Sequence, residues 1–126
     1  MNKQAIATEA APGAIGPYSQ GMEIGNLVFT SGQLGIDPAT GQLGQDVKEQ
    51  TRLSLSNVKA ILEAAGTSMD QVVKTTVFLK DMNDFATMNE IYSSFFNQPF
   101  PARSAIEVAR LPKDALVEIE VIALKK

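Results

Sequence analysis

Residues 101–108 read PARSAIEV and residues 116–124 read LVEIEVIAL. Both stretches are rich in β-branched and apolar residues that alternate with polar ones, so we predict two strands, Ala102 to Val108 and Leu116 to Leu124. Because successive side chains of a strand point to opposite faces, Arg103 shares one face with Ala105 and Glu107. Residues 109–114 form the loop that joins the two strands.

The second strand carries two carboxylates on one face. Glu118 and Glu120 are flanked there by Leu116 and Ile122, whereas the opposite face is apolar throughout. Carboxylates among apolar neighbours have raised pKa values and suit general acid or base catalysis. The other interpretation is that both side chains mark the wetter face of an antiparallel strand, and the strand taken alone favours it.

Two amphipathic helices are predicted upstream. The first opens at Asp46, with Glu49 three residues on as in a capping box, and stops at Gly66. The second runs from about residue 83 to residue 96. The apolar positions are Val47, Leu55, Val58, Ile61, Leu62 and Ala65 in the first helix, and Phe85, Met88, Tyr92 and Phe95 in the second.

The remaining segments predict strands and turns. A hairpin is expected around Gly25-Asn26, with residues 27–31 as its second strand, and residues 72–79 form a β-branched run. Residues 37–41, DPATG, form a turn. The order β-β-β-α-β-α-β-β predicts an α+β fold, in which two helices cover one face of a mixed sheet, and a single domain accounts for residues 1–126.

Some of these strands are apolar on both faces. Leu27-Val28-Phe29 and Val77-Phe78-Leu79 do not alternate with polar residues. Two helices cover only one side of such a sheet, so either loops and the N-terminal segment cover the other side, or a second copy of the chain does. We favour a homo-oligomer that packs sheet against sheet, because a chain of this length has few spare loops.

The composition excludes much chemistry. The 126 residues include no cysteine and no histidine, which removes thiolate nucleophiles, Ser-His-Asp triads and zinc sites that use these ligands. The net charge is −3 and the basic residues are scattered, which argues against nucleic-acid binding. There is no Walker loop or G-x-G-x-x-G motif, and we expect no metal or cofactor. With no membrane-spanning run and no signal peptide, a cytoplasmic location is expected.

Arg103 and Gly32 are the candidates for binding. An arginine at the start of a strand is most often solvated or ion-paired. The functional interpretation is that its planar fork holds a carboxylate in two parallel hydrogen bonds. Gly32 follows the predicted strand of residues 27–31, where a glycine permits either close approach to a ligand or a bulge. Tyr18 lies just after a turn.

Several blocks of the chain resemble the reactive intermediate deaminase family, in particular its RidA-type members. These blocks are APGAIGPY at residues 11–18, TSGQ at 30–33, VKTTVF at 73–78, PARSAIEVARLPKD at 101–114 and VEIE at 117–120. The resemblance extends from Ala5 to Ala123, and the block at 101–114 is the most specific. It implies a chorismate-mutase-like α+β fold assembled as a homotrimer, with clefts between neighbouring subunits.

The resemblance also implies an activity. It is the hydrolysis of 2-aminoacrylate, or its tautomer 2-iminopropanoate, to pyruvate and ammonia, and of 2-iminobutanoate to 2-oxobutanoate, which protects enzymes that use pyridoxal phosphate. In the family, the arginine matching Arg103 binds the substrate carboxylate and the glutamate matching Glu118 positions water. A cysteine usually stands where this chain has Ala105, so the pocket shape is expected to differ there. The residues expected to bind substrate or line the cleft are Tyr18, Ser31, Gly32, Asn89, Arg103 and Ala105.

Two other functions stay open at this stage. A non-catalytic protein that binds a 2-oxo acid and regulates a protein partner would use Arg103 in the same way. An RNA-acting protein that inhibits translation is disfavoured by the negative charge and the lack of histidine.

Overall fold

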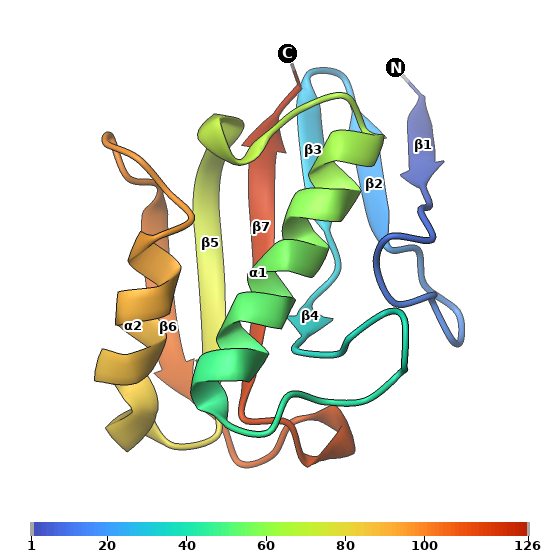
Figure 1. Ribbon diagram of the computed structural model, residues 1–126. Coiled ribbons are helices and arrows are strands. Elements are labelled where there is room, and N and C mark those ends of the chain that lie inside the picture. The colour runs from blue at the N-terminus through green and yellow to red at the C-terminus, as the bar shows by residue number, and fades with distance from the viewer. Residues whose placement is uncertain (1, 126) are drawn as a thin grey trace.

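Two helices lie on one side of a seven-stranded mixed sheet in the computed structural model, which describes residues 2–125 (Figure 1). This arrangement confirms the predicted α+β class; Met1 and Lys126 of the predicted domain lie outside the described residues. The strands are β1 (Lys3–Ile6), β2 (Gly21–Ile24), β3 (Leu27–Thr30), β4 (Gln33–Leu34), β5 (Val72–Leu79), β6 (Ala102–Glu107) and β7 (Val117–Leu124), and the helices are α1 (Val47–Ala64) and α2 (Phe85–Ser93).

The strands follow the order β1-β2-β3-β7-β5-β6, and β4 pairs with β7 beside that path. Only the β5–β6 pair is parallel among these pairings. The prediction of three strands before the first helix is wrong, because β4 is a fourth. It has only two residues, too few to show a period, and it is defined by its pairing with Glu118 and Ile119.

The predicted start and stop of the first helix are confirmed. The side chain of Asp46 accepts a hydrogen bond of 2.8 Å from the backbone N–H of Glu49, and Gly66 follows the helix with a φ of +82°. The predicted second helix is too long at both ends. Its first residues form a 3-10 turn, η2 (Met82–Asp84), and Phe96 is buried although the chain has already left the helix, so apolar spacing alone does not mark the end.

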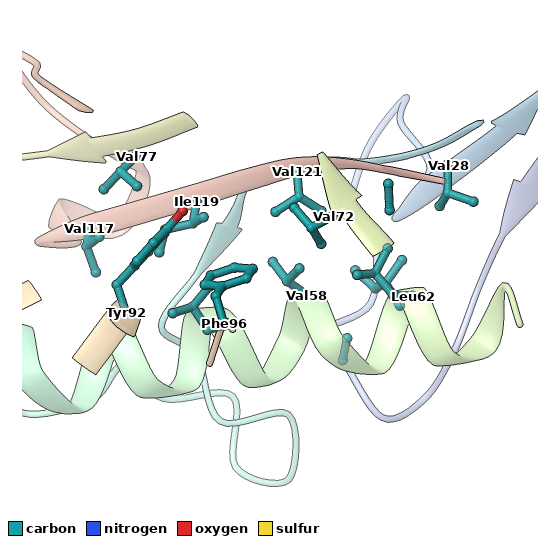
Figure 2. Packing of buried hydrophobic residues seen from close by; sticks show 14 of the residues in the cluster. Val28, Val58, Leu62, Val72, Val77, Tyr92, Phe96, Val117, Ile119 and Val121 are labelled. Carbon is teal, nitrogen blue, oxygen red and sulfur yellow. The ribbon is translucent and has the colours of Figure 1, made fainter. Parts of the chain in front are cut away.

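The core lies between the sheet and the two helices (Figure 2). On β7 the residues that alternate into this core are Val117, Ile119, Val121 and Ala123, as predicted. The opposite face of the sheet is not closed by loops of the chain, because Phe29, Ile106 and Leu124 remain exposed there, with Ile106 at 46%. Among residues 2–125, no helix has the length and hydropathy that a membrane span requires.

Candidate functional site

Arg103 points from β6 toward the face of α2 that covers the sheet. Its Nη1 donates a hydrogen bond of 2.6 Å to Oδ1 of Asn89, and its Cζ lies 5.3 Å from the centroid of the Phe85 ring and 4.7 Å from that of the Tyr92 ring. Residues four and seven positions apart share one helix face, so α2 presents an amide and two aromatic rings to one guanidinium. A cation over aromatic rings is held in place by their negative faces.

No carboxylate of the described residues lies within ion-pair distance of Arg103. The ion pairs in this part of the chain are Arg52 with Glu49, Arg110 with Asp114, and Lys125 with Glu23. The guanidinium carries five N–H donors, and one of them has an acceptor within residues 2–125. A half-buried guanidinium held in this way matches a planar carboxylate ligand, which accepts two parallel hydrogen bonds.

Glu118 lies on β7 beside Gly32. A Cβ built on Gly32 would lie 2.8 Å from Cδ of Glu118, so any side chain at position 32 would displace the carboxylate. Glu118 is half-buried, and this burial, followed by the negative charge of Glu120, raises the pKa of its carboxyl above the usual value. Glu118 therefore fits the interpretation as a general acid or base. Glu120 is exposed and fits the other interpretation, a side chain on the wetter face of the strand.

The residues next to Gly32 hold the N-terminal segment. Ser31 Oγ donates a hydrogen bond of 2.6 Å to the carbonyl oxygen of Ser19. The buried Gln20 donates to the carbonyl oxygens of Thr8, Ala11 and Pro12 and accepts from the backbone N–H of Thr8. Tyr18 is thereby anchored through its neighbours while its own side chain stays 52% exposed, beside a hollow of about 600 Å³ lined by residues between Ala5 and Gln20.

The predicted site residues fall into two groups on opposite faces of the sheet. Arg103 and Asn89 lie on the face covered by the helices, where Ala105 also packs partly buried against the core. Gly32 and Glu118 lie together on the other side of the sheet, because the neighbours of Glu118 along β7 face the helices. Within one chain the structure therefore does not bring Arg103 and Glu118 together.

Sequence reasoning missed the surroundings of Arg103. Phe85 and Tyr92 are apolar positions of the predicted second helix, and both rings also contact the guanidinium. The available signal was Asn89, which lies between Phe85 and Tyr92 on the same helix face and interrupts the apolar stripe. In the part of the chain from residue 2 to residue 125, no three acidic, histidine or cysteine side chains gather closely enough to hold a metal ion.

Comparison with known proteins places the chain in a family. Residues 8–125 match the model of the family described as Endoribonuclease L-PSP. The 2-iminobutanoate/2-iminopropanoate deaminase of Salmonella typhimurium is 60% identical over 124 residues, which cover 96% of this chain and 97% of that protein.

Solved structures agree with this assignment over nearly the whole chain. The structure of E. coli TdcF with bound serine has a TM-score of 0.93 and 52% identity, covering 98% of this chain and 99% of that one. RidA from the Antarctic bacterium Psychrobacter sp. PAMC 21119 has a TM-score of 0.94 and 49% identity, covering 96% and 98% of the two chains. The chain therefore belongs to the reactive intermediate deaminase family, which the model named Endoribonuclease L-PSP describes.

Proposed function

We propose that this protein hydrolyses small 2-imino acids and their enamine tautomers to 2-oxo acids and ammonia. The substrates are 2-iminopropanoate, formed from 2-aminoacrylate, and 2-iminobutanoate, and the products are pyruvate and 2-oxobutanoate. One observation carries the proposal: the half-buried guanidinium of Arg103 lies over two rings of α2 and has no carboxylate partner among residues 2–125. Relatives named 2-iminobutanoate/2-iminopropanoate deaminase support the choice of substrate.

A complete site needs two copies of the chain. Arg103 and Glu118 lie on opposite faces of the sheet, so a ligand that touches both must lie between the Arg103 side of one copy and the Glu118 side of the next. Such a contact joins two different surfaces, and it closes when the copies form a ring. The exposed Phe29, Ile106 and Leu124 on the Glu118 side supply an apolar surface for it. The resemblance to the family implies three copies in the ring, and we propose a homotrimer with a cleft at each boundary.

The chemistry in that cleft is a hydrolysis in which atoms and charge balance. Arg103 binds the substrate carboxylate. Glu118 of the partner subunit accepts a proton from water as the water oxygen bonds to the imine carbon, and the electron pair of the C=N bond moves to nitrogen, which takes up that proton from Glu118. Glu118, ionised again, then accepts the proton of the new hydroxyl group as the C=O bond forms and passes it to the nitrogen, so that the C–N bond breaks and neutral ammonia leaves.

This reaction requires no reactive side chains beyond Arg103 and Glu118. An imine carbon is already electrophilic, so a modest reduction of the barrier is enough, and each tenfold gain takes about 1.4 kcal/mol. Holding the substrate and water together supplies several such factors. No cofactor is needed in this mechanism, and Tyr18, Ser31, Gly32, Asn89 and Ala105 are proposed to line the cleft. The single domain and the cytoplasmic location expected from the sequence are part of the same proposal.

The proposal is tested with 2-aminoacrylate produced by a serine dehydratase in the presence of this protein. We expect the wild type to accelerate release of pyruvate and ammonia above the uncatalysed rate, and Arg103→Ala to release them at the uncatalysed rate. Arg110→Ala is the matched control, because Arg110 is exposed and pairs only with Asp114 among the described residues. Wild-type release at the uncatalysed rate, with a 2-oxo acid still bound, would instead favour the regulatory binding protein.

A further inference from the structure

Tyr92 is locked in place beneath the sheet. Its side chain extends from α2 toward the strands with the hydroxyl oxygen at the sheet (Figure 2), and the residue is 4% exposed. The hydroxyl oxygen lies 2.7 Å from Oγ1 of Thr75, which is completely buried in β5, and the two groups share a hydrogen bond. Burial raises the pKa of the Tyr92 hydroxyl, so the group is neutral over the ordinary pH range.

Thr75 is also the β5 residue paired with Arg103 in the parallel ladder between β5 and β6. Arg103, Thr75 and Tyr92 are therefore each in contact with the other two. The backbone ladder joins Arg103 to Thr75, the hydroxyl bond joins Thr75 to Tyr92, and the Tyr92 ring returns to Arg103, with 4.7 Å between the ring centroid and Cζ. The ring cannot turn away from the guanidinium without breaking a buried hydrogen bond, which leaves both hydroxyls unpaired.

We propose that the Tyr92–Thr75 pair positions Arg103 for the substrate carboxylate, an inference that rests on the proposed function. An arginine side chain has many rotamers, and holding it in one of them lowers the entropy lost when it binds a ligand. The ring supplies an attractive surface in one orientation, and the hydrogen bond from Nη1 to Asn89 fixes the rotation of the guanidinium plane. Tyr92 is thus a positioning residue, and it acts on binding through Arg103.

The matched pair of variants is Tyr92→Leu and Phe96→Leu. The two rings pack together with 4.6 Å between centroids, and both residues are buried, so each variant removes one ring from the same core cluster. Of these two rings, the one over Arg103 is that of Tyr92. We expect Tyr92→Leu to raise KM for the imine about tenfold with a smaller change in kcat, whereas Phe96→Leu lowers Tm and leaves KM within about twofold. Equal changes in KM for Tyr92→Leu and Phe96→Leu would show that Tyr92 contributes only to core packing.

The hydroxyl bond is tested by a second set of variants. Tyr92→Phe keeps the ring and leaves the buried Thr75 hydroxyl unpaired. Thr75→Val removes that hydroxyl and leaves the Tyr92 hydroxyl unpaired. We expect each to raise KM by less than Tyr92→Leu does. The double variant should raise KM by less than the sum of the two single effects, because the bond is already lost in either single variant. Strictly additive effects on KM would show that the bond does not transmit position to Arg103.

A spectroscopic readout separates this inference from the proposed function. The Nε–Hε signal of Arg103 in the NMR spectrum reports the ring beneath it and needs no substrate. We expect a ring-current shift in the wild type, in Tyr92→Phe and in Phe96→Leu, and a smaller shift in Tyr92→Leu, in which the ring of Phe85 alone remains near the guanidinium. If that pattern holds and the wild type does not hydrolyse imines, the proposed function is wrong. If hydrolysis is seen but the signal does not depend on Tyr92, the positioning role is wrong.

Discussion

Gly32 and Glu118 are so close that no side chain fits at position 32 without moving the carboxylate. A Cβ on Gly32 would lie 2.8 Å from Cδ, 3.0 Å from Cγ and 3.0 Å from Oε2 of Glu118. Because β4 follows directly and pairs with Glu118 and Ile119 of β7, the backbone at Gly32 is held against this side chain by the sheet itself. The glycine therefore leaves the Glu118 carboxylate room to lie over the backbone.

Gly32→Ala is expected to lower kcat/KM by at least about tenfold, which corresponds to about 1.4 kcal/mol in the barrier. The added methyl group displaces the proposed base from its position against the backbone. The measurement is imine hydrolysis at constant pH. Gly13→Ala is the control, because a Cβ there meets nothing within 4 Å. An unchanged rate in Gly32→Ala would show that the position of the carboxylate is unimportant.

The pH dependence of kcat/KM is expected to report Glu118. The base must be ionised, and burial and the charge of Glu120 raise its pKa, so activity should begin to fall at a pH above that at which an ordinary glutamate titrates. Glu120→Gln removes the like charge and should move this acid limb to lower pH. A limb that stays where it was after Glu120→Gln would contradict the assignment. The rate is measured above the uncatalysed hydrolysis at each pH.

Glu118→Gln is expected to stabilise the fold while it lowers activity by about 100-fold or more. A raised pKa means that the folded state binds this proton more tightly than the unfolded state does. The unfolding free energy that Glu118 contributes is thus present below its unfolded pKa and lost as the pH rises through its folded pKa. At neutral pH the ionised carboxylate of Glu118 destabilises the folded state, and the neutral glutamine side chain does not. Urea unfolding of both proteins at pH 5 and pH 8 measures the difference in unfolding free energy. A stabilisation by Glu118→Gln that is not larger at pH 8 than at pH 5 would contradict the raised pKa.

Gly35→Ala is expected to lower the unfolding free energy by about 3 kcal/mol. A Cβ on Gly35 would lie 2.3 Å from both Cα and the carbonyl oxygen of Gln50, so helix α1 would have to move away from the loop that follows β4. Gln50 also donates to the carbonyl oxygen of Gly44 and accepts from the backbone N–H of Leu116, so the shift would spread to β7. Denaturant unfolding, with Gly13→Ala again as control, measures the loss. A change within about 0.5 kcal/mol would show that the helix moves easily.

The sequence contains enough to predict the helices, the longer strands and the faces of β7. The alternation of Val117, Ile119 and Val121 with Glu118 and Glu120 is a local pattern, and it survives in the structure because one face is buried. Helix α1 is likewise predicted by its stripe and by Asp46.

The relation between Arg103 and Glu118 is not a local pattern. Alternation predicts which side chains of one strand share a face. Whether Arg103 of β6 and Glu118 of β7 lie on the same side of the sheet depends on how both strands pair with β5. The contact of Gly32 with Glu118 depends in the same way on β4, which is too short to show a period. Both relations come from tertiary pairing.

The claim that one site takes Arg103 from one copy and Glu118 from the next is tested most directly by mixing two inactive variants. Arg103→Ala and Glu118→Gln are unfolded together, refolded at equal concentration and assayed for imine hydrolysis. By random assortment in a ring, about a quarter of the boundaries combine an intact Arg103 with an intact Glu118. We predict that the mixture recovers about a quarter of the wild-type activity per chain, while each variant refolded alone stays inactive. A mixture that is as inactive as its components would contradict the shared site.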